Sequence, residues 1–329
     1  MSKTEASGLS RRPILAIAGA AVGTLLVWYD FFLFVSLGGL IGAKFLPAGN
    51  GADGYVFALL AVAAGLVMRP VGALVFGRLA DGKGRKPALL TSILLMAAAT
   101  LIVALLPTRA QIGVAAPTLL IALRLLQGLA LGGEPVAAAI YAAELAPAGK
   151  RGLWTGAIQM AGTLGLALAL GAALSLKGML GEAGFESWGW RIPFALSAVL
   201  IGVWAWLRLA LAESAVVETV GENRKPIAEA LASPANLKRV GLALLGLAAG
   251  QAIVWQTGQL YVLSFLQSVL HVDATVAEGL MLPALLAGAP FFVLFGWLSD
   301  KVGRKPLLLI VTAGMAITLA TMAFIFGTA

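Results

Sequence analysis

The sequence contains no cysteine and a single histidine, His271, among its 329 residues. Disulfides, thiolate metal sites and thiol nucleophiles within it are therefore excluded, and one histidine gives little basis for a histidine-ligated metal centre. Charge is also scarce: Asp, Glu, Lys and Arg make up 12% of the residues, against about 25% in a soluble domain. Hydrophobic residues make up 60%, and the mean hydropathy is +0.96. This composition excludes an ordinary soluble enzyme or a disordered chain and favours a polytopic membrane protein.

Nine apolar stretches are each about 20 residues or longer, which is long enough to cross a bilayer as a helix. They lack the alternation of barrel strands, and a backbone inside hydrocarbon must satisfy its own hydrogen bonds. We therefore expect an all-α integral membrane protein. The predicted spans are 13–37, 53–75, 87–107, 117–143, 153–175, 190–211, 238–267, 276–296 and 306–328.

The basic residues predict the orientation of these spans. Of the 23 Lys and Arg residues, 17 fall on the side of the N-terminus and two, Arg69 and Arg124, lie within helices. This asymmetry predicts a cytoplasmic N-terminus in a multi-pass protein of the inner (plasma) membrane. It also accounts for the net charge of +8 without a nucleic-acid partner. The four basic residues of the outer segments are Lys44, Arg109, Lys177 and Arg191.

An internal repeat is the most specific pattern in the sequence. Residues 76–87 read FGRLADGKGRKP and residues 295–306 read FGWLSDKVGRKP, so 8 of 12 positions are identical at an offset of 219. Each copy is a tight inner loop between the second and third spans of its half. Asp81 and Asp300 are placed to meet a helix N-terminus, where the helix dipole favours an anion. We take these acids, with Arg85 and Arg304, as candidate gating residues.

The repeated loop resembles the signature of the major facilitator superfamily, whose members are carriers with two parallel six-helix halves. Further motifs are similar to its metabolite:proton symporter branch, which carries small carboxylates and zwitterions such as oxoglutarate, citrate, shikimate, proline and betaine. Val27 stands where members commonly have a glutamate, so any role of that acid is absent. The motifs are WYDFF at 28–32, MRPVGA at 68–73, RLLQG at 124–128, GGE at 132–134, AELAP at 143–147 and WGWRIP at 188–193.

The resemblance implies a major facilitator fold with three segments. These are a six-helix N-terminal bundle at 1–211, a cytoplasmic linker at 212–237 and the first three helices of a C-terminal bundle at 238–329. Within the linker, 226–232 is either a short surface helix or plain loop. Helices ten to twelve are missing, so the sequence is either a fragment, which we favour, or a truncated product. A monomer is the superfamily default.

We single out four ionisable residues in the interior of the predicted spans: Asp30, Arg69, Arg124 and Glu134. Each costs roughly 2.5–3.5 kcal/mol to insert, which makes it a candidate for function. At 1.5 Å per residue, Asp30 and Arg124 lie about 25 and 28 Å from the inner ends of their helices. We expect them to pair if the helices adjoin. Arg69 and Glu134 lie about 9 and 14 Å from the inner ends of their helices. They form a second candidate pair, acting as a gate or a brace.

The pairing of Asp30 with Arg124 suggests a mechanism for proton coupling. Burial favours a neutral acid, whereas a nearby guanidinium favours the carboxylate. Asp30 would therefore take up a proton when Arg124 turns away or towards a substrate anion. The resemblance implies the same coupling role at these two positions. The alternative is a static salt bridge that fixes helix packing.

Several polar and aromatic residues within the spans are candidates for substrate binding. In the seventh span, Gln251, Trp255 and Gln259 recur every four residues and so share a face, and Gln256 lies one step round. Cavity lining is one interpretation of these residues and contact between helices is the other. The remaining candidates are Tyr29, Arg124, Gln127 and Gln159.

The sequence thus predicts a secondary active transporter that carries a small carboxylate or zwitterionic metabolite with protons by alternating access. No nucleophile–base pair or metal-ligand cluster indicates an enzyme, and no cofactor is expected. The alternatives are a facilitator without proton coupling and a truncated membrane protein that transports nothing.

Overall fold

The computed structural model of the chain describes residues 11–46, 51–83, 85–132, 134–211, 233–242, 255 and 257–313. Every regular element in these ranges is a helix. The chain divides into two compact units. Unit 1 comprises Met1–Leu211 and Met281–Arg304, and unit 2 comprises Ala212–Leu280 and Lys305–Ala329. The domain boundaries predicted from the sequence stay a prediction.

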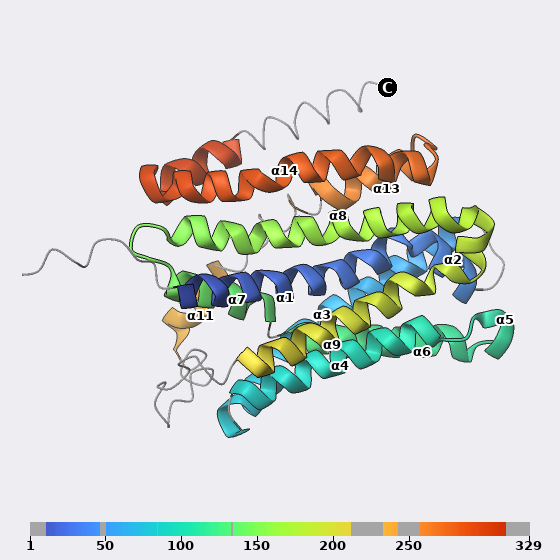
Figure 1. The fold of residues 1–329 in the computed structure, drawn as a ribbon, viewed down its shortest axis with the longest axis horizontal. Coiled ribbons are helices and arrows are strands. Elements are labelled where there is room, and N and C mark those ends of the chain that lie inside the picture. Colours follow the sequence, from blue (N-terminus) through green and yellow to red (C-terminus); the bar gives the residue numbers. More distant parts are fainter. Residues whose placement is uncertain are drawn as a thin grey trace, which may run out of the picture. The chain divides into compact units, whose positions relative to one another are not determined.

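Long helices joined by short connections make up most of unit 1 (Figure 1). Helix α1 packs against α7, α8 and α9, while α3 packs against α6 and α4 packs against α9. The elements are α1 (Arg11–Ser36), α2 (Gly38–Phe45), α3 (Gly51–Lys83), α4 (Arg85–Leu105), α5 (Arg109–Ile112), α6 (Ala115–Leu131), α7 (Glu134–Leu145), α8 (Arg151–Gly184), the π-helical turn η1 (Phe185–Gly189) and α9 (Arg191–Leu211). The helix α14 (Ala274–Val302) belongs to unit 1 from Met281 onward.

The described helices have the length and apolarity of membrane spans. Four are long enough to cross a bilayer: Ile17–Ser36, Val56–Leu79, Arg151–Gly189 and Ala274–Val302. Three shorter apolar helices cover Leu90–Leu105, Ala115–Leu131 and Arg191–Leu207. All seven overlap spans predicted from the sequence. Large apolar side chains such as Val67 point outward, as expected for helices that face lipid rather than water.

The fourth predicted span, 117–143, is divided rather than continuous. Helix α6 ends at Leu131, and α7 begins at Glu134. The amide of Gly132 donates to the carbonyl of Leu129, three residues back, so the helix tightens at its end. Pro135, which follows closely, lacks a backbone N–H and cannot continue the ladder of the preceding turn. The span is therefore described as two helical elements, and Gly133 between them lies outside the described residues.

Glycine allows α3 and α6 to approach closely. A side chain at Gly128 would collide with the backbone at Gly65, and one at Gly72 would collide with the carbonyl of Leu129. Close backbone approach through small residues is the usual means by which membrane helices gain packing energy. The interface fixes the face that α6 presents to the rest of the bundle.

The seventh predicted span, 238–267, is described only in part. The structure shows α11 (Pro234–Leu242), a helical Trp255, the π-helical turn η4 (Thr257–Tyr261) and α13 (Val262–Ser268). Residues 243–254 and the possible linker helix at 226–232 lie outside the described residues. Of the ninth span, 306–328, the described part is helical over 304–313.

Candidate functional site

Asp30 lies at the centre of a buried polar network. Its side chain is fully buried on α1, and both carboxylate oxygens accept hydrogen bonds. Ser197 Oγ on α9 donates to Oδ1 at 3.2 Å, and Gln127 Nε2 on α6 donates to Oδ2 at 3.3 Å. Gln127 Nε2 also donates to Thr100 Oγ1 on α4 at 2.8 Å. These four residues, the Asp30 network, join four helices: the carboxylate links α1, α6 and α9, and the Gln127 amide adds α4.

Arg124 lies one helical turn before Gln127 on α6 and is 4% exposed. Its guanidinium carbon is 3.5 Å from the centre of the Phe34 ring, and Phe34 lies one turn after Asp30 on α1. The two helices therefore make adjacent contacts, Asp30 with Gln127 and Phe34 with Arg124. Among the described residues, Nε and Nη2 of Arg124 have no hydrogen-bond partner. The hydrogen bonds of Asp30 come from Gln127 and Ser197, and Arg124 keeps unused donors.

Unused donors on a buried cation have a chemical consequence. Leaving a buried polar group without a partner costs about 1–3 kcal/mol, and more for a charged group. An anionic oxygen reaching Arg124 would recover that cost and form strong, charge-assisted hydrogen bonds. The Oε1 atom of Gln127 is also buried, and it has no partner within the described part of the chain. Arg124 and Gln127 together therefore offer both donors and an acceptor to a polar ligand.

Two other predicted binding residues on the first and fifth spans are in different surroundings. Tyr29 is 1% exposed, and its hydroxyl donates to the carbonyl of Pro193 on α9 at 3.2 Å. This geometry favours a packing role in the observed conformation. Gln159 lies on an exposed position of α8. Neither side chain belongs to the Asp30 network.

Arg69 on α3 packs against aromatic rings of α1. Its guanidinium carbon is 5.3 Å from the centre of the Trp28 ring and 5.2 Å from that of Phe31. Its Nε and Nη2 atoms are buried and find no hydrogen-bond partner in the described ranges. The side chain of its expected partner, Glu134, is outside what the structure describes, so this pair stays a prediction.

The second copy of the repeated loop contacts the start of α8. Asp300 Oδ1 accepts a hydrogen bond from the backbone N–H of Gly152 at 2.8 Å, and Oδ2 accepts one from Leu153 at 2.9 Å. Both donors are in the first turn of α8, where amides lack partners within the helix. The expectation that Asp300 meets a helix N-terminus is confirmed. Arg304 is exposed, and the side chains of Asp81 and Arg85 are not among those described.

The candidates in the seventh span cannot be assembled into a site. Gln251 and Gln256 lie outside the described residues, while Trp255 and Gln259 are partly buried in unit 2. In the ranges that the structure describes, no group of three His, Cys, Asp or Glu side chains could hold a metal ion.

Sequence reasoning did not single out Thr100, Ser197 or Phe34, which complete the surroundings of Asp30 and Arg124. It also passed over Glu278, a carboxylate near the start of α14 that is 1% exposed. Thr100 and Ser197 gave only a weak signal, that of an isolated hydroxyl in an apolar helix. Phe34 gave no signal, because aromatic residues are ordinary in such helices.

Comparison with known proteins places the fold. Residues 20–329 match the Major Facilitator Superfamily. Among solved structures, the xylose transporter XylE from Escherichia coli in a partially occluded inward-open conformation aligns with a TM-score of 0.64 at 21% identity, covering 96% of this chain and 80% of that one. A structure of the D-xylose–proton symporter aligns with a TM-score of 0.67 at 20% identity over 96% and 75% of the two chains.

Curated relatives match at higher identity. The alpha-ketoglutarate permease of Escherichia coli is 36% identical over 302 residues, which are 90% of this chain and 68% of that protein. The shikimate transporter of the same bacterium is 31% identical, covering 88% of this chain and 67% of its own length. A putative proline/betaine transporter of Staphylococcus haemolyticus is 32% identical over 94% and 66%. These relatives match the metabolite-transport branch expected from the motifs.

The helical fold of the described residues, the repeated loop and the match over nearly the whole sequence all indicate one family. The chain belongs to the major facilitator superfamily, a family of membrane transporters rather than enzymes.

Proposed function

We propose that the protein is a proton-coupled symporter of a small carboxylate or zwitterionic metabolite that works by alternating access. It resides in the bacterial inner membrane with its N-terminus in the cytoplasm and acts as a monomer. The curated relatives named for alpha-ketoglutarate, shikimate and proline/betaine support this substrate class. The relative named as an inner membrane metabolite transport protein supports the location.

The observation that carries the proposal is a fully buried carboxylate near a buried guanidinium with unused donors. Asp30 is held by neutral donors, Ser197 and Gln127, rather than by a hydrogen bond from Arg124. A proton on Asp30 would therefore leave Arg124 with no nearby charged partner in the Asp30 network. A substrate carboxylate would then be the natural counter-ion for Arg124. Proton uptake and substrate binding are coupled because both change the charge balance of one site.

The contact of Asp300 with α8 fits a gate in the same cycle. It ties α14 to the start of α8 by two charge-assisted hydrogen bonds. Opening this end of unit 1 would require both bonds to break. We assign gating to Asp300 and, by the repeat, to Asp81, with Arg85, Arg304 and the Arg69–Glu134 pair in supporting roles.

The test replaces Asp30 by asparagine, which keeps the shape of the side chain and removes its titration. In proteoliposomes with an imposed pH gradient, Asp30→Asn is expected to abolish accumulation of a labelled substrate above equilibrium. Exchange of labelled for unlabelled substrate, which needs no net proton movement, should survive. Glu144→Gln is the control, because Glu144 is exposed on α7 and the same change should leave accumulation intact.

The substrate is found by screening labelled oxoglutarate, shikimate, proline and betaine with the unmodified protein. Retained accumulation by Asp30→Asn would remove Asp30 from the coupling mechanism. Transport by the unmodified protein that ignores the pH gradient would identify an uncoupled facilitator instead.

A further inference from the structure

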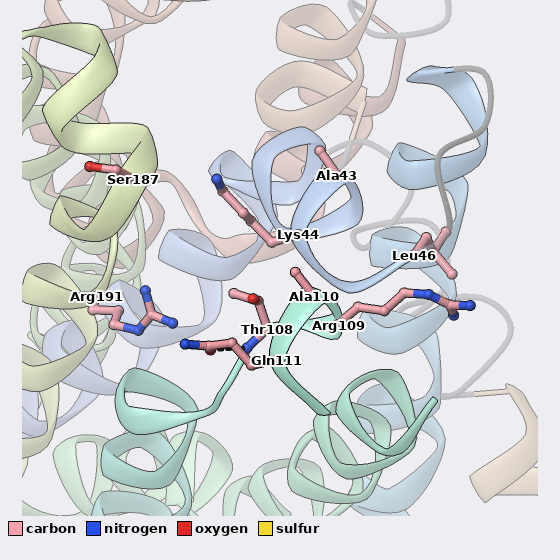
Figure 2. Close-up of a pocket in the computed structure, with 9 residues that line it drawn as sticks. All are labelled: Ala43, Lys44, Leu46, Thr108, Arg109, Ala110, Gln111, Ser187 and Arg191. Atoms are coloured by element: carbon pink, nitrogen blue, oxygen red, sulfur yellow. Dashed lines mark hydrogen bonds between the residues drawn. The ribbon is translucent and has the colours of Figure 1, made fainter. Parts of the chain in front are cut away.

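A basic pocket lies where the short elements of unit 1 connect its long helices (Figure 2). It has a volume of about 580 Å³, which is within the usual range for small-molecule sites. The connections from α1 to α3, from α4 to α6 and from α8 to α9 build its walls. The lining residues are Ala43, Lys44, Leu46, Thr108, Arg109, Ala110, Gln111, Ser187 and Arg191.

The lining carries three cations and no carboxylate: Lys44 on α2, Arg109 on α5 and Arg191 at the start of α9. These are three of the four basic residues that the sequence places in outer segments. Membrane topology depletes basic residues from such segments, so topology does not explain why three gather in one place. Three positive charges around one pocket repel each other unless an anion lies among them.

The pocket also holds hydrogen-bond donors in defined positions. Arg191 is anchored, because it lies 4.4 Å from the Trp190 ring centre and its Nη2 donates to the carbonyl of Leu106 at 3.2 Å. The Oε1 atom of Gln111 accepts from the backbone of Thr108 at 2.9 Å, which leaves the Nε2 group as a donor. In Figure 2, Lys44 extends towards Ser187, whereas Arg109 extends towards Leu46. Guanidinium, ammonium and amide groups together suit an oxyanion with more than one charged oxygen.

We propose that this pocket binds a small polyvalent oxyanion, a carboxylate or a phosphate, on the face of unit 1 opposite the repeated loops. Two sources offer this chemistry: a soluble anion from the outer aqueous side, and the phosphate of an anionic lipid headgroup. The binding itself does not rest on the proposed function. One point rests on the proposed function: if the pocket ligand is a soluble carboxylate, that carboxylate is the transported metabolite.

The absence of native cysteine allows a clean measurement of the charge in the pocket. Ala110→Cys places the single thiol of the protein on the pocket wall, and Met179→Cys places it on an 80% exposed position of α8 as a reference. The rates of reaction with sulfonatoethyl methanethiosulfonate, an anion, and trimethylammonioethyl methanethiosulfonate, a cation, are compared at each site. We expect a preference for the anionic reagent at Ala110→Cys over the reference.

Neutralising the basic side chains of the pocket identifies the groups that cause the preference for the anionic reagent. Lys44→Gln with Arg109→Gln is expected to lower the anionic preference at Ala110→Cys by about tenfold, while the preference at Met179→Cys stays constant. Lys177→Gln is the matched control, because Lys177 is the fourth outer basic residue and does not line the pocket. This change should leave the preference at Ala110→Cys intact.

Protection experiments identify the anion. In detergent, citrate or inorganic phosphate should slow labelling of Ala110→Cys, and the double substitution should remove this protection. In nanodiscs, phosphatidylglycerol should slow labelling relative to phosphatidylcholine if a lipid headgroup occupies the pocket. Protection by the soluble anions alone assigns a soluble ligand, and protection by the lipid alone assigns the headgroup.

Two results would overturn the inference: equal reagent preference at both cysteine sites, or no protection by any of these oxyanions. Labelling does not require transport, so failure of the proposed function would leave this outcome unaffected. Conversely, proton-driven accumulation that depends on Asp30 could persist in a protein whose pocket binds nothing.

Discussion

At the residue scale, the hydrogen bond from Gln127 to Thr100 is the contact that fixes the amide beside Asp30. It is 2.8 Å long, and both side chains are buried. Because Nε2 of Gln127 is shared between Thr100 and Asp30, losing the hydroxyl would free the amide to rotate. Within a membrane such bonds are worth about 0.6 kcal/mol on average.

A double-mutant cycle measures this contact. Thr100→Val and Gln127→Leu should each destabilise the protein, and the coupling energy between them should be about 0.6 kcal/mol. Unfolding in mixed micelles of detergent and sodium dodecyl sulfate supplies the free energies. Thr118→Val on the same α6 is the control: its hydroxyl is exposed and bonds only to the carbonyl of Val114, so its coupling to Gln127→Leu should be near zero. A coupling energy near zero between Thr100→Val and Gln127→Leu would show that other contacts hold the amide.

The sequence marked Asp30, Arg124 and Gln127 as interior, but it passed over Glu278, placed Gln159 wrongly and could not predict the partners of Asp30. Insertion cost alone marked Asp30 and Arg124, and Gln127 was marked as a polar side chain within a predicted span. The hydroxyl partners Thr100 and Ser197 carry little signal, because hydroxyls in helices often bond to their own backbone. Thr24 does so, donating to the carbonyl of Ala20 at 2.9 Å. The depth of a side chain along a helix follows from residue count. The neighbour that it faces depends on how the helix is rotated about its axis, which packing decides.

At the element scale, the seam between α3 and α6 orients the polar face of α6. Helix α6 presents Gly128 to α3 while Arg124 and Gln127 are buried beside α1. A side chain at Gly128 would meet the backbone of Gly65, which cannot move aside as a flexible side chain would. Arg124 lies one turn before Gly128, and its carbonyl lies against Gly65 of α3, so the seam and the site are next to each other on α6.

Replacing Gly128 by alanine should push α3 and α6 apart and destabilise the protein by about 1–3 kcal/mol, the usual cost of overpacking. Gly202→Ala on α9 is the matched control, because nothing lies within 4 Å of the added methyl group. It should be neutral, or slightly stabilising through the lower conformational freedom of the unfolded chain. Thermal unfolding in detergent compares the two variants. Equal melting temperatures would mean that the seam relaxes without cost.

Apolar length sufficed to predict the described spans, but not where one helix ends within a span or where short elements form. Helix α6 ends at Leu131, where the amide of Gly132 bonds three residues back, shortly before Pro135. The short helices α2 and α5, which build the basic pocket, fall in segments that were interpreted only as connections. In contrast, the contact of Asp300 with a helix N-terminus followed from the repeat, because the dipole makes one partner strongly preferred.

At the scale of the whole molecule, alternating access requires contacts that close one end of the protein. The free energy of these contacts must be smaller than the free energy that ligand and proton binding supply. In the proposed cycle Asp300 would make such a contact, through hydrogen bonds of 2.8 and 2.9 Å to the first turn of α8. Hydrogen bonds to a charged group contribute about 1.5–3 kcal/mol. A ligand with differential affinity of this size can shift the balance between two conformations.

Removing the Asp300 carboxylate should therefore favour the conformation in which this end is open. Ser299 is partly buried beside Gly152, so Ser299→Cys, the only thiol in the protein, reports opening through its reaction with a neutral maleimide. We expect Asp300→Ala to raise the labelling rate about tenfold, in line with the loss of these bonds, and Asp300→Asn to raise it less because one acceptor remains. Asp273→Ala is the control, because Asp273 caps the other end of α14 through Thr275 and Val276. An unchanged rate for Asp300→Ala would show that close glycine packing between Gly152 and Gly296, rather than the carboxylate, holds this end shut.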